Sequence, residues 1–178
     1  MRLSLYDHPN GVETGPGNRV VYDVSGDEAH AGAARVTGRA LRFELEDGDG
    51  SGALLSASVE LPSGDALLRC DRVDFPPGGV AYRHTHPGPG IRCLLFGSMC
   101  IDTGGRSTAY DPRQAWFESG PEPVHAVASE HEGSAFVRVM LLPAEWEGKR
   151  TITYLDPEDA AKPKLQRAQV YLEVPVQR

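Results

Sequence analysis

The chain has 178 residues, enough for one domain with a sizeable core. Its 25 acidic residues outnumber 18 basic ones, and the formal net charge of −7 argues against nucleic acid or an anionic membrane as a partner. The three cysteines form no CxxC pair, which argues against a disulfide framework or a zinc ribbon. The N-terminus lacks the apolar run of a signal peptide and no stretch approaches the length of a membrane span, so we expect a cytoplasmic protein.

The predicted elements are mostly short strands. Residues 1–18, rich in Pro, Gly and Asn, are expected to form a partly ordered N-terminal arm. The strand-like runs that follow are Arg19–Val24, Ala40–Glu46, Leu54–Leu61, Leu67–Phe75, Val80–His86, Ile91–Ile101, Ala115–Glu118, Val124–Ala128, Ala135–Leu142 and Gln169–Val174. Turn signals rich in Gly, Pro and Asp separate most of them. Only Pro157–Gln166 suggests a helix, and Pro163 limits it to a turn or two. The pattern predicts one all-β domain over residues 19–178, a sandwich or a closed barrel.

The run His84-Thr85-His86 is the only place where two of the six histidines come close together. Alternate side chains of a strand share a face, so the two imidazoles are expected to project the same way. The rigid turn Pro87-Gly88-Pro89-Gly90 follows directly. We interpret the pair as half of a metal site, the alternative being two surface histidines on an edge strand.

The spacing of Gly78, His84, His86, Gly90 and Gly97 resembles the first signature motif of the cupin superfamily. This resemblance implies a double-stranded β-helix, or jelly-roll barrel, with N-terminal extension strands and little helix. In that motif a glycine precedes His-x-His, an acidic ligand follows, and a second glycine closes the pattern.

A lone histidine, His125, follows a Pro/Gly turn and resembles the second cupin motif. Together the two motifs cover about residues 67–142 of the predicted barrel. The resemblance therefore assigns His84, His86 and His125 as metal ligands. The alternative for His125 is a core or loop histidine.

Two departures from the family pattern concern the ligands. Gly90 stands where the family usually carries a glutamate, and Ser129 stands where it usually carries an asparagine. Either the fourth position is empty, or an acid such as Glu118 supplies the carboxylate from elsewhere. A histidine-only triad resembles the thiol dioxygenases and some ring- or diketone-cleaving dioxygenases, which use Fe(II). Without a carboxylate the site is one unit more positive, which favours small anionic substrates.

Two further side chains are candidates for contact with a substrate. Arg92 lies two residues after Gly90, and in regular strand phase it would point into the barrel and pair bidentately with a carboxylate. Tyr82 lies two residues before His84 and would share its face, with its hydroxyl available to a ligand or to O₂. The alternatives are an exposed or ion-paired arginine and a tyrosine used in packing.

The favoured function is a mononuclear non-haem dioxygenase that uses iron and acts on a small anionic molecule. One alternative is a cupin that binds a small ligand without turnover, and another is an isomerase or lyase that uses zinc or manganese. Imidazole ligands suit several divalent metals, so zinc and nickel remain open beside iron and manganese. We also expect a homodimer, formed by pairing of exposed strand edges such as Gln169–Val174.

Overall fold

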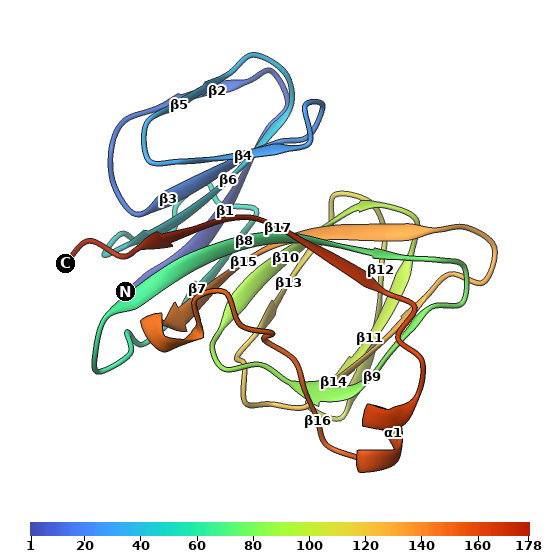
Figure 1. Ribbon diagram of the computed structural model, residues 1–178. Helices are drawn as coiled ribbons and strands as arrows, with labels where there is room; N and C mark the ends of the chain where they lie inside the picture. The colour runs from blue at the N-terminus through green and yellow to red at the C-terminus, as the bar shows by residue number, and fades with distance from the viewer.

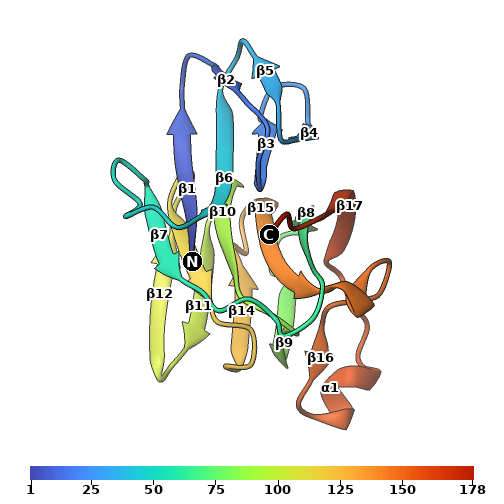
Figure 2. The ribbon, with the colours of Figure 1, turned by 90° about the vertical axis from the view of Figure 1, so that its left-hand side faces the viewer.

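The computed structural model describes residues 1–178 as a set of antiparallel strands with little helix (Figure 1). The first 58 residues supply a five-stranded N-terminal sheet, seen above the barrel in Figure 2. Its strand order is β4 (Glu28–Ala31), β3 (Arg19–Asp23), β6 (Ala40–Glu46), β1 (Arg2–His8) and β7 (Leu55–Ser58). A separate small pair joins β2 (Val12–Thr14) to β5 (Ala34–Val36).

Two further five-stranded sheets face each other and enclose the barrel interior (Figure 1). The middle sheet has the order β13 (Ala115–Glu118), β10 (Gly90–Phe96), β15 (Ser134–Pro143), β8 (Ala66–Phe75) and β17 (Arg167–Pro175). The third sheet has the order β12 (Arg106–Tyr110), β11 (Met99–Thr103), β14 (Val124–Ala128), β9 (Val80–Thr85) and β16 (Thr153–Tyr154). A 3₁₀ turn (Ala144–Trp146) and helix α1 (Pro157–Ala161) connect the last strands. The predicted all-β jelly-roll fold is confirmed.

The middle sheet is buried on both faces. On one face Leu68, Cys70 and Val139 join the apolar core that also contains Leu5 and Phe43 of the N-terminal sheet. On the other face, Val73, Phe75, Leu94 and Phe136 join a second core with residues of the third sheet. The strands β10 and β15 therefore read as nearly continuous apolar runs, as doubly covered strands do. The charged residues that interrupt these runs are the ones that matter for the site below.

The expected single run Ile91–Ile101 is divided into β10 and β11 at Gly97. This glycine has φ of +77°, and a Cβ atom there would lie 2.4 Å from the carbonyl oxygen of Gly133. Only glycine fits both the left-handed backbone and this close approach. The closing glycine of the first motif therefore has a steric cause in this chain.

The structure corrects the prediction of an N-terminal arm over residues 1–18 and of a domain that starts at residue 19. Residues 2–8 form β1, which lies inside its sheet between β6 and β7, and Leu3 and Leu5 are fully buried. The alternation Leu3-Ser4-Leu5 is a strand signal, but it is too short to stand out before the Gly- and Pro-rich stretch that follows.

The C-terminal elements follow the sequence pattern closely. Helix α1 ends at Ala161, two residues before Pro163, as expected for a short helix. Strand β17 pairs with β8 as its only neighbouring strand and lies at the edge of its sheet, and dimerisation through this edge stays a prediction. No helix is long and apolar enough to cross a bilayer.

A polar cluster around Asp27 ties the N-terminal sheet to the barrel. The Asp27 carboxylate accepts hydrogen bonds from the hydroxyls of Tyr22 and Tyr171 and lies 3.2 Å from Nη1 of Arg72. Burial acts to raise the pKa of Asp27, but the hydrogen bonds from Tyr171 and Tyr22 and the charge of Arg72 lower it overall. The contact joins the turn between β3 and β4 to strands β8 and β17.

We predict that Asp27→Asn lowers the free energy of unfolding by about 1 kcal/mol, because a charged acceptor shared by three donors becomes a neutral amide at a partly exposed site. Asparagine tolerates the positive φ of 53° at this position, so the backbone is preserved. Urea denaturation measures the change, with the exposed Asp65→Asn as control.

We also predict that the stability difference between the parent and Asp27→Asn depends on pH. A carboxyl whose pKa is lowered in the folded state stabilises the fold above its ordinary pKa of 3.8, and this stabilisation is lost as the pH falls. The difference between the parent and Asp27→Asn should therefore shrink below about pH 4. An unchanged difference at low pH would contradict the assigned role of the carboxylate.

Candidate functional site

The interior face of the middle sheet carries charged residues. Strand alternation sends Leu68, Cys70 and Val139 toward the N-terminal sheet, and it sends their neighbours into the barrel. These inward residues are Arg69 and Asp71 from β8, Arg92 from β10, Glu118 from β13 and Arg138 from β15. Each is at most 7% exposed, and Asp71 and Arg92 are fully buried. Charges this deep must be paired or must face a ligand.

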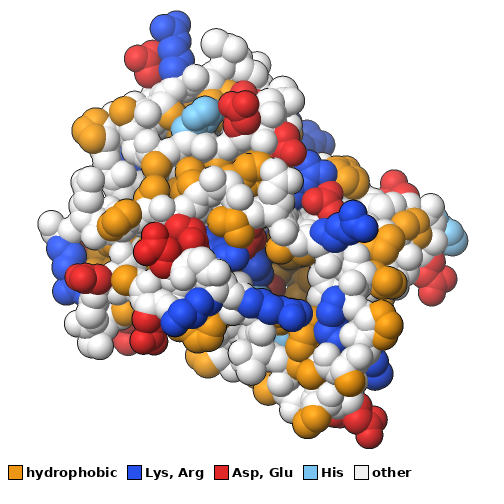
Figure 3. All heavy atoms as spheres, viewed as in Figure 1, with side chains coloured by type: hydrophobic (Ala, Val, Ile, Leu, Met, Phe, Trp, Pro, Cys, Tyr) orange, Lys and Arg blue, Asp and Glu red, His pale blue; other side chains and the backbone are white.

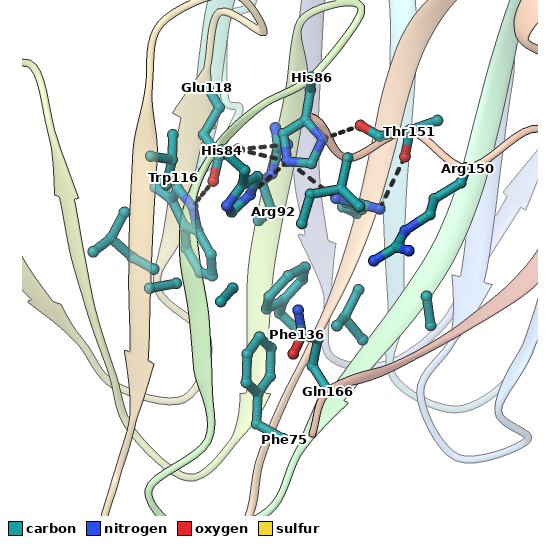
Figure 4. Close-up of a pocket in the computed structure, with 18 of the residues that line it drawn as sticks. Phe75, His84, His86, Arg92, Trp116, Glu118, Phe136, Arg150, Thr151 and Gln166 are labelled. Carbon is teal, nitrogen blue, oxygen red and sulfur yellow. Dashed lines mark hydrogen bonds and ion pairs between the residues drawn. The ribbon is translucent and has the colours of Figure 1, made fainter. Parts of the chain in front are cut away.

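The barrel encloses a cavity of about 260 Å³. Figure 4 shows His84, His86, Arg92 and Glu118 gathered at one end of it, and Phe136 and Phe75 at the other. Further lining residues are Arg69, Val73, Ala81, Ile101, Trp116, Val124, Ala126, Arg138, Arg150, Thr151, Ile152, Lys164, Gln166 and Ala168. Figure 3 shows a hollow on one face of the molecule with Lys and Arg side chains around it. A cavity that is charged at one end and apolar at the other suits an amphipathic small molecule.

The two histidines of the predicted pair lie together in this cavity, and their Nε2 atoms are 3.2 Å apart. Nδ1 of His84 is 2.6 Å from the carbonyl oxygen of Tyr82, and Nδ1 of His86 is 2.6 Å from that of Thr151. A carbonyl only accepts, so each Nδ1 carries the hydrogen and each Nε2 of the neutral ring presents a lone pair. The two lone pairs therefore face each other inside the cavity.

Burial lowers the pKa of both imidazoles. The pKa of His86 falls well below its ordinary value because burial and the charges of Arg138 and Arg92 all disfavour the imidazolium. Burial also lowers the pKa of His84, against the opposing effect of its hydrogen bond to Tyr82. At neutral pH both rings are therefore neutral and able to act as metal ligands.

Glu118 extends toward the histidines from the neighbouring strand β13. The indole Nε1 of Trp116 donates to Oε1 of Glu118 at 2.8 Å, which fixes the carboxylate. The other oxygen, Oε2, lies 3.5 Å from Nε2 of His86 and 2.6 Å from Nη2 of Arg92. It is buried without an aligned hydrogen-bond donor.

Gly90 lies directly opposite Glu118 in the pairing of β10 with β13. A Cβ atom on Gly90 would be 2.7 Å from the carbonyl oxygen of Val139, 2.8 Å from Cγ of Met140 and 3.0 Å from Nη1 of Arg92. The space that a side chain at position 90 would need is thus partly filled by the guanidinium of Arg92. The acid is found across the strand pair, at Glu118.

Arg92 points into the cavity, as strand phase predicted. Its Nη1 donates to the carbonyl oxygen of Gly90 at 2.7 Å, and its Nη2 pairs with Glu118. Burial lowers the pKa of Arg92 to about 10, against the opposing effect of Glu118, so the side chain is still a cation at neutral pH.

A second buried cation, Arg138, is held by Asp71. Its Nε and Nη2 donate to the two carboxylate oxygens at 2.6 and 3.1 Å, and its Nη1 lies 3.4 Å from Nε2 of His86. Nε of Arg69 lies 3.3 Å from the same carboxylate. The sequence interpretation missed Asp71, Arg69 and Arg138. The available signal was a charged residue inside each apolar strand run, at an inward-facing position.

The structure does not bring His125 to the histidine pair. Its neighbours Val124 and Ala126 line the cavity, so strand alternation turns His125 to the outer face of the third sheet. There its Nδ1 pairs with Oδ2 of Asp102 at 3.1 Å, and the side chain is 34% exposed. The prediction that three histidines share one site is therefore wrong for His125. The structure instead brings two histidines, His84 and His86, close to one carboxylate, that of Glu118.

Tyr82 is also outside the cavity. The pairing of β14 with β9 shifts register at this point, so that Ala81 and His84 both face inward although they are three residues apart. The bulge turns the Tyr82 ring outward, where the ammonium of Lys162 lies 4.7 Å from its centroid. Its carbonyl oxygen, rather than its hydroxyl, contacts the site through His84.

The residues that could hold a metal are His84, His86 and Glu118. No three or more His, Cys, Asp or Glu side chains are already arranged to enclose an ion. Glu118 is directed toward Arg92 instead, and its Oε2 is 3.5 Å from Nε2 of His86, beyond the length of a metal–ligand bond. The facing lone pairs and the unsatisfied carboxylate oxygen nevertheless suit a divalent cation, and the carbonyl bonds at Nδ1 are the usual support of a ligating histidine.

Comparison with solved structures finds cupin and RmlC-like proteins. The polyketide cyclase RemF from Streptomyces resistomycificus is 21% identical, with a TM-score of 0.41 over 53% of this chain and 63% of that chain. An RmlC-like cupin from Shewanella frigidimarina NCIMB 400 is 16% identical, with a TM-score of 0.40 over 49% and 87%. KdgF from Halomonas sp. is 19% identical, with a TM-score of 0.37 over 49% and 79%. Each of these matches covers about half of this chain.

In these comparisons the chain spans less than two thirds of the RemF chain. No protein-family model matches the sequence, and no curated protein does.

We predict that Asp71→Asn lowers the free energy of unfolding by about 3–5 kcal/mol, because two buried guanidinium groups lose their shared counter-charge. Asp74→Asn, on the same strand but in a partly exposed pair with Arg72, should cost at most about 1 kcal/mol. Chemical denaturation of both variants measures the contrast, and equal losses would contradict the role of Asp71.

Proposed function

We propose that the protein binds a divalent transition metal through His84, His86 and Glu118, and a small organic anion beside it. The observation that carries the proposal is the pair of Nε2 lone pairs, 3.2 Å apart and oriented by two backbone carbonyls. Two lone pairs repel at this distance unless a cation or a hydrogen lies between them. The low pKa of both rings disfavours the hydrogen.

The charge of the cavity supports an anionic partner. Five basic side chains line it (Arg69, Arg92, Arg138, Arg150 and Lys164), against the single acidic side chain of Glu118. This excess of positive charge occurs in a chain whose net charge is −7. A positive cavity with low-dielectric walls raises the local concentration of anions.

The reaction class we propose is oxygenase-like. Two histidines and one carboxylate form the ligand set of non-haem Fe(II) oxygenases with open coordination positions. When bound, iron would supply the activation of O₂. The side chains of this chain would bind the substrate anion, orient it beside the metal and exclude water.

A second candidate is an anion-binding site without metal. The observation that favours it is Arg138, whose Nη1 lies 3.4 Å from Nε2 of His86 and places a fixed positive charge beside the proposed metal position. In this case His86 accepts a hydrogen bond from Arg138, and the protein binds a small ligand without oxidising it.

Metal titration separates the two candidates. Isothermal titration of the metal-free protein with Zn²⁺ should give one site, and His86→Ala should weaken it by about 100-fold or more, because even partners outside the ligand shell cost 10–100-fold. His125→Ala, which removes an imidazole from the outer face, should bind Zn²⁺ like the parent. Equal metal content in parent and His86→Ala by elemental analysis would overturn the metal proposal.

Oxygen uptake tests the reaction class. Protein loaded anaerobically with Fe(II) should consume O₂ when it is mixed with a panel of small aromatic acids, diketones and thiols, and His84→Ala should not. Retention of iron with no O₂ uptake across the panel would exclude the oxygenase for these substrate classes.

A further inference from the structure

The guanidinium of Arg92 has an edge without hydrogen-bond partners. Its Nη1 donates to Gly90, but its Nε and Nη2 are buried and make no hydrogen bond. Oε2 of Glu118 comes within 2.6 Å of Nη2, and that oxygen also lacks a hydrogen-bond donor. The pair is therefore attracted by charge but poorly aligned, although both partners are removed from water.

The free edge of Arg92 has the geometry for a carboxylate. Nε and Nη2 of a guanidinium are two parallel donors that match the two oxygens of one carboxylate. Glu118 cannot offer both oxygens, because Nε1 of Trp116 holds Oε1 at 2.8 Å. A carboxylate from a ligand can supply both.

Glu118 lies between Arg92 and the histidine pair. Its Oε2 is 2.6 Å from Nη2 of Arg92 and 3.5 Å from Nε2 of His86. A cation between the two histidines would attract Oε2 away from Arg92. The buried guanidinium would then lack a counter-charge, and its affinity for another anion would rise.

We propose that Glu118 exchanges partners on ligand binding. The carboxylate of a small monocarboxylic acid takes the free edge of Arg92, and Glu118 moves to the metal held by His84 and His86. Metal and carboxylate therefore bind with positive coupling, each strengthening the other. This inference rests on the proposed metal site, and it identifies both the substrate class and a mutual dependence of the two ligands.

The walls of the cavity favour a flat apolar body on this acid. Trp116 is the cross-strand partner of Arg92, and its ring lies edge-to-face with Phe136 at 5.3 Å between centroids. Phe75 lies 6.0 Å beyond Phe136. The cavity of about 260 Å³ is smaller than the roughly 300–1,000 Å³ of sites for drug-sized ligands, so an acid of one ring fits better than a larger one.

Calorimetric titration with sodium benzoate tests the coupling. Benzoate should bind the Zn²⁺-loaded protein more tightly than the metal-free protein by about 5–150-fold, and Zn²⁺ affinity should rise by the same factor in saturating benzoate. Benzamide, which has the same ring and no charge, should show no such gain. Equal benzoate affinity in the two states would overturn the proposal, and so would an equal gain for benzamide.

Two variants separate exchange at Arg92 from direct binding of benzoate to the metal. Arg92→Lys keeps the charge but loses the two-donor edge, and it should lose benzoate affinity in both states while it still binds Zn²⁺. Unchanged benzoate binding by this variant would overturn the proposal. Arg83→Lys, an exposed residue of β9 outside the cavity, is the matched control and should behave like the parent.

The second variant, Glu118→Gln, tests the exchange in the metal-free protein. Removing the charge that competes for Arg92 should raise the benzoate affinity of the metal-free protein about five-fold or more, and should abolish the coupling to Zn²⁺. If the parent binds no Zn²⁺, the proposed metal site has failed, and the metal-free comparison alone decides whether Glu118 competes with a carboxylate for Arg92. No gain in benzoate affinity would then overturn the exchange.

Discussion

The burial of five charged side chains on one face of the middle sheet is the constraint on which the site depends. Asp71 binds Arg138 through two hydrogen bonds, and Arg69 lies beside the same carboxylate. A buried ion pair of this kind contributes little net stability, because desolvation offsets the attraction. Its effect here is geometric, because it fixes the guanidinium of Arg138 beside His86.

The presence of glycine at position 90, where an acidic residue was expected, has a physical explanation that involves Arg92 and Glu118. The motif that the sequence resembles led us to expect an acidic residue at this position. Here the Cβ position is closed by Val139 and Met140, and the guanidinium of Arg92 lies beside it. Glu118 is the residue directly opposite, so one strand pair carries both a cation and an anion beside the histidines.

The sequence predicted the fold, the inward orientation of His84 and His86 and the position of Arg92, because all three depend on strand alternation near a marked turn. The sequence analysis named Glu118 only as one possible source of the fourth ligand, the alternative being that this ligand position is empty. The placement of His125 and Tyr82 failed for different reasons. The face of His125 depends on the phase of β14, which a single histidine does not define. Tyr82 is displaced by a bulge, and a bulge leaves no mark in the pattern of apolar residues.

Part of the N-terminal sheet was predicted from the sequence to be a partly ordered arm. This sheet determines which side chains of the middle sheet face the cavity. Its apolar residues form one core with the outward-facing residues of β8, β10 and β15. A slip of one residue in any of these strands would send Arg92 or Arg138 into that core and turn Val139 or Cys93 toward the cavity. Because the outer face is covered by apolar side chains, such a slip would bury an unpaired guanidinium. The covering sheet therefore fixes the register that points the charges inward, and the site depends on residues that never touch it.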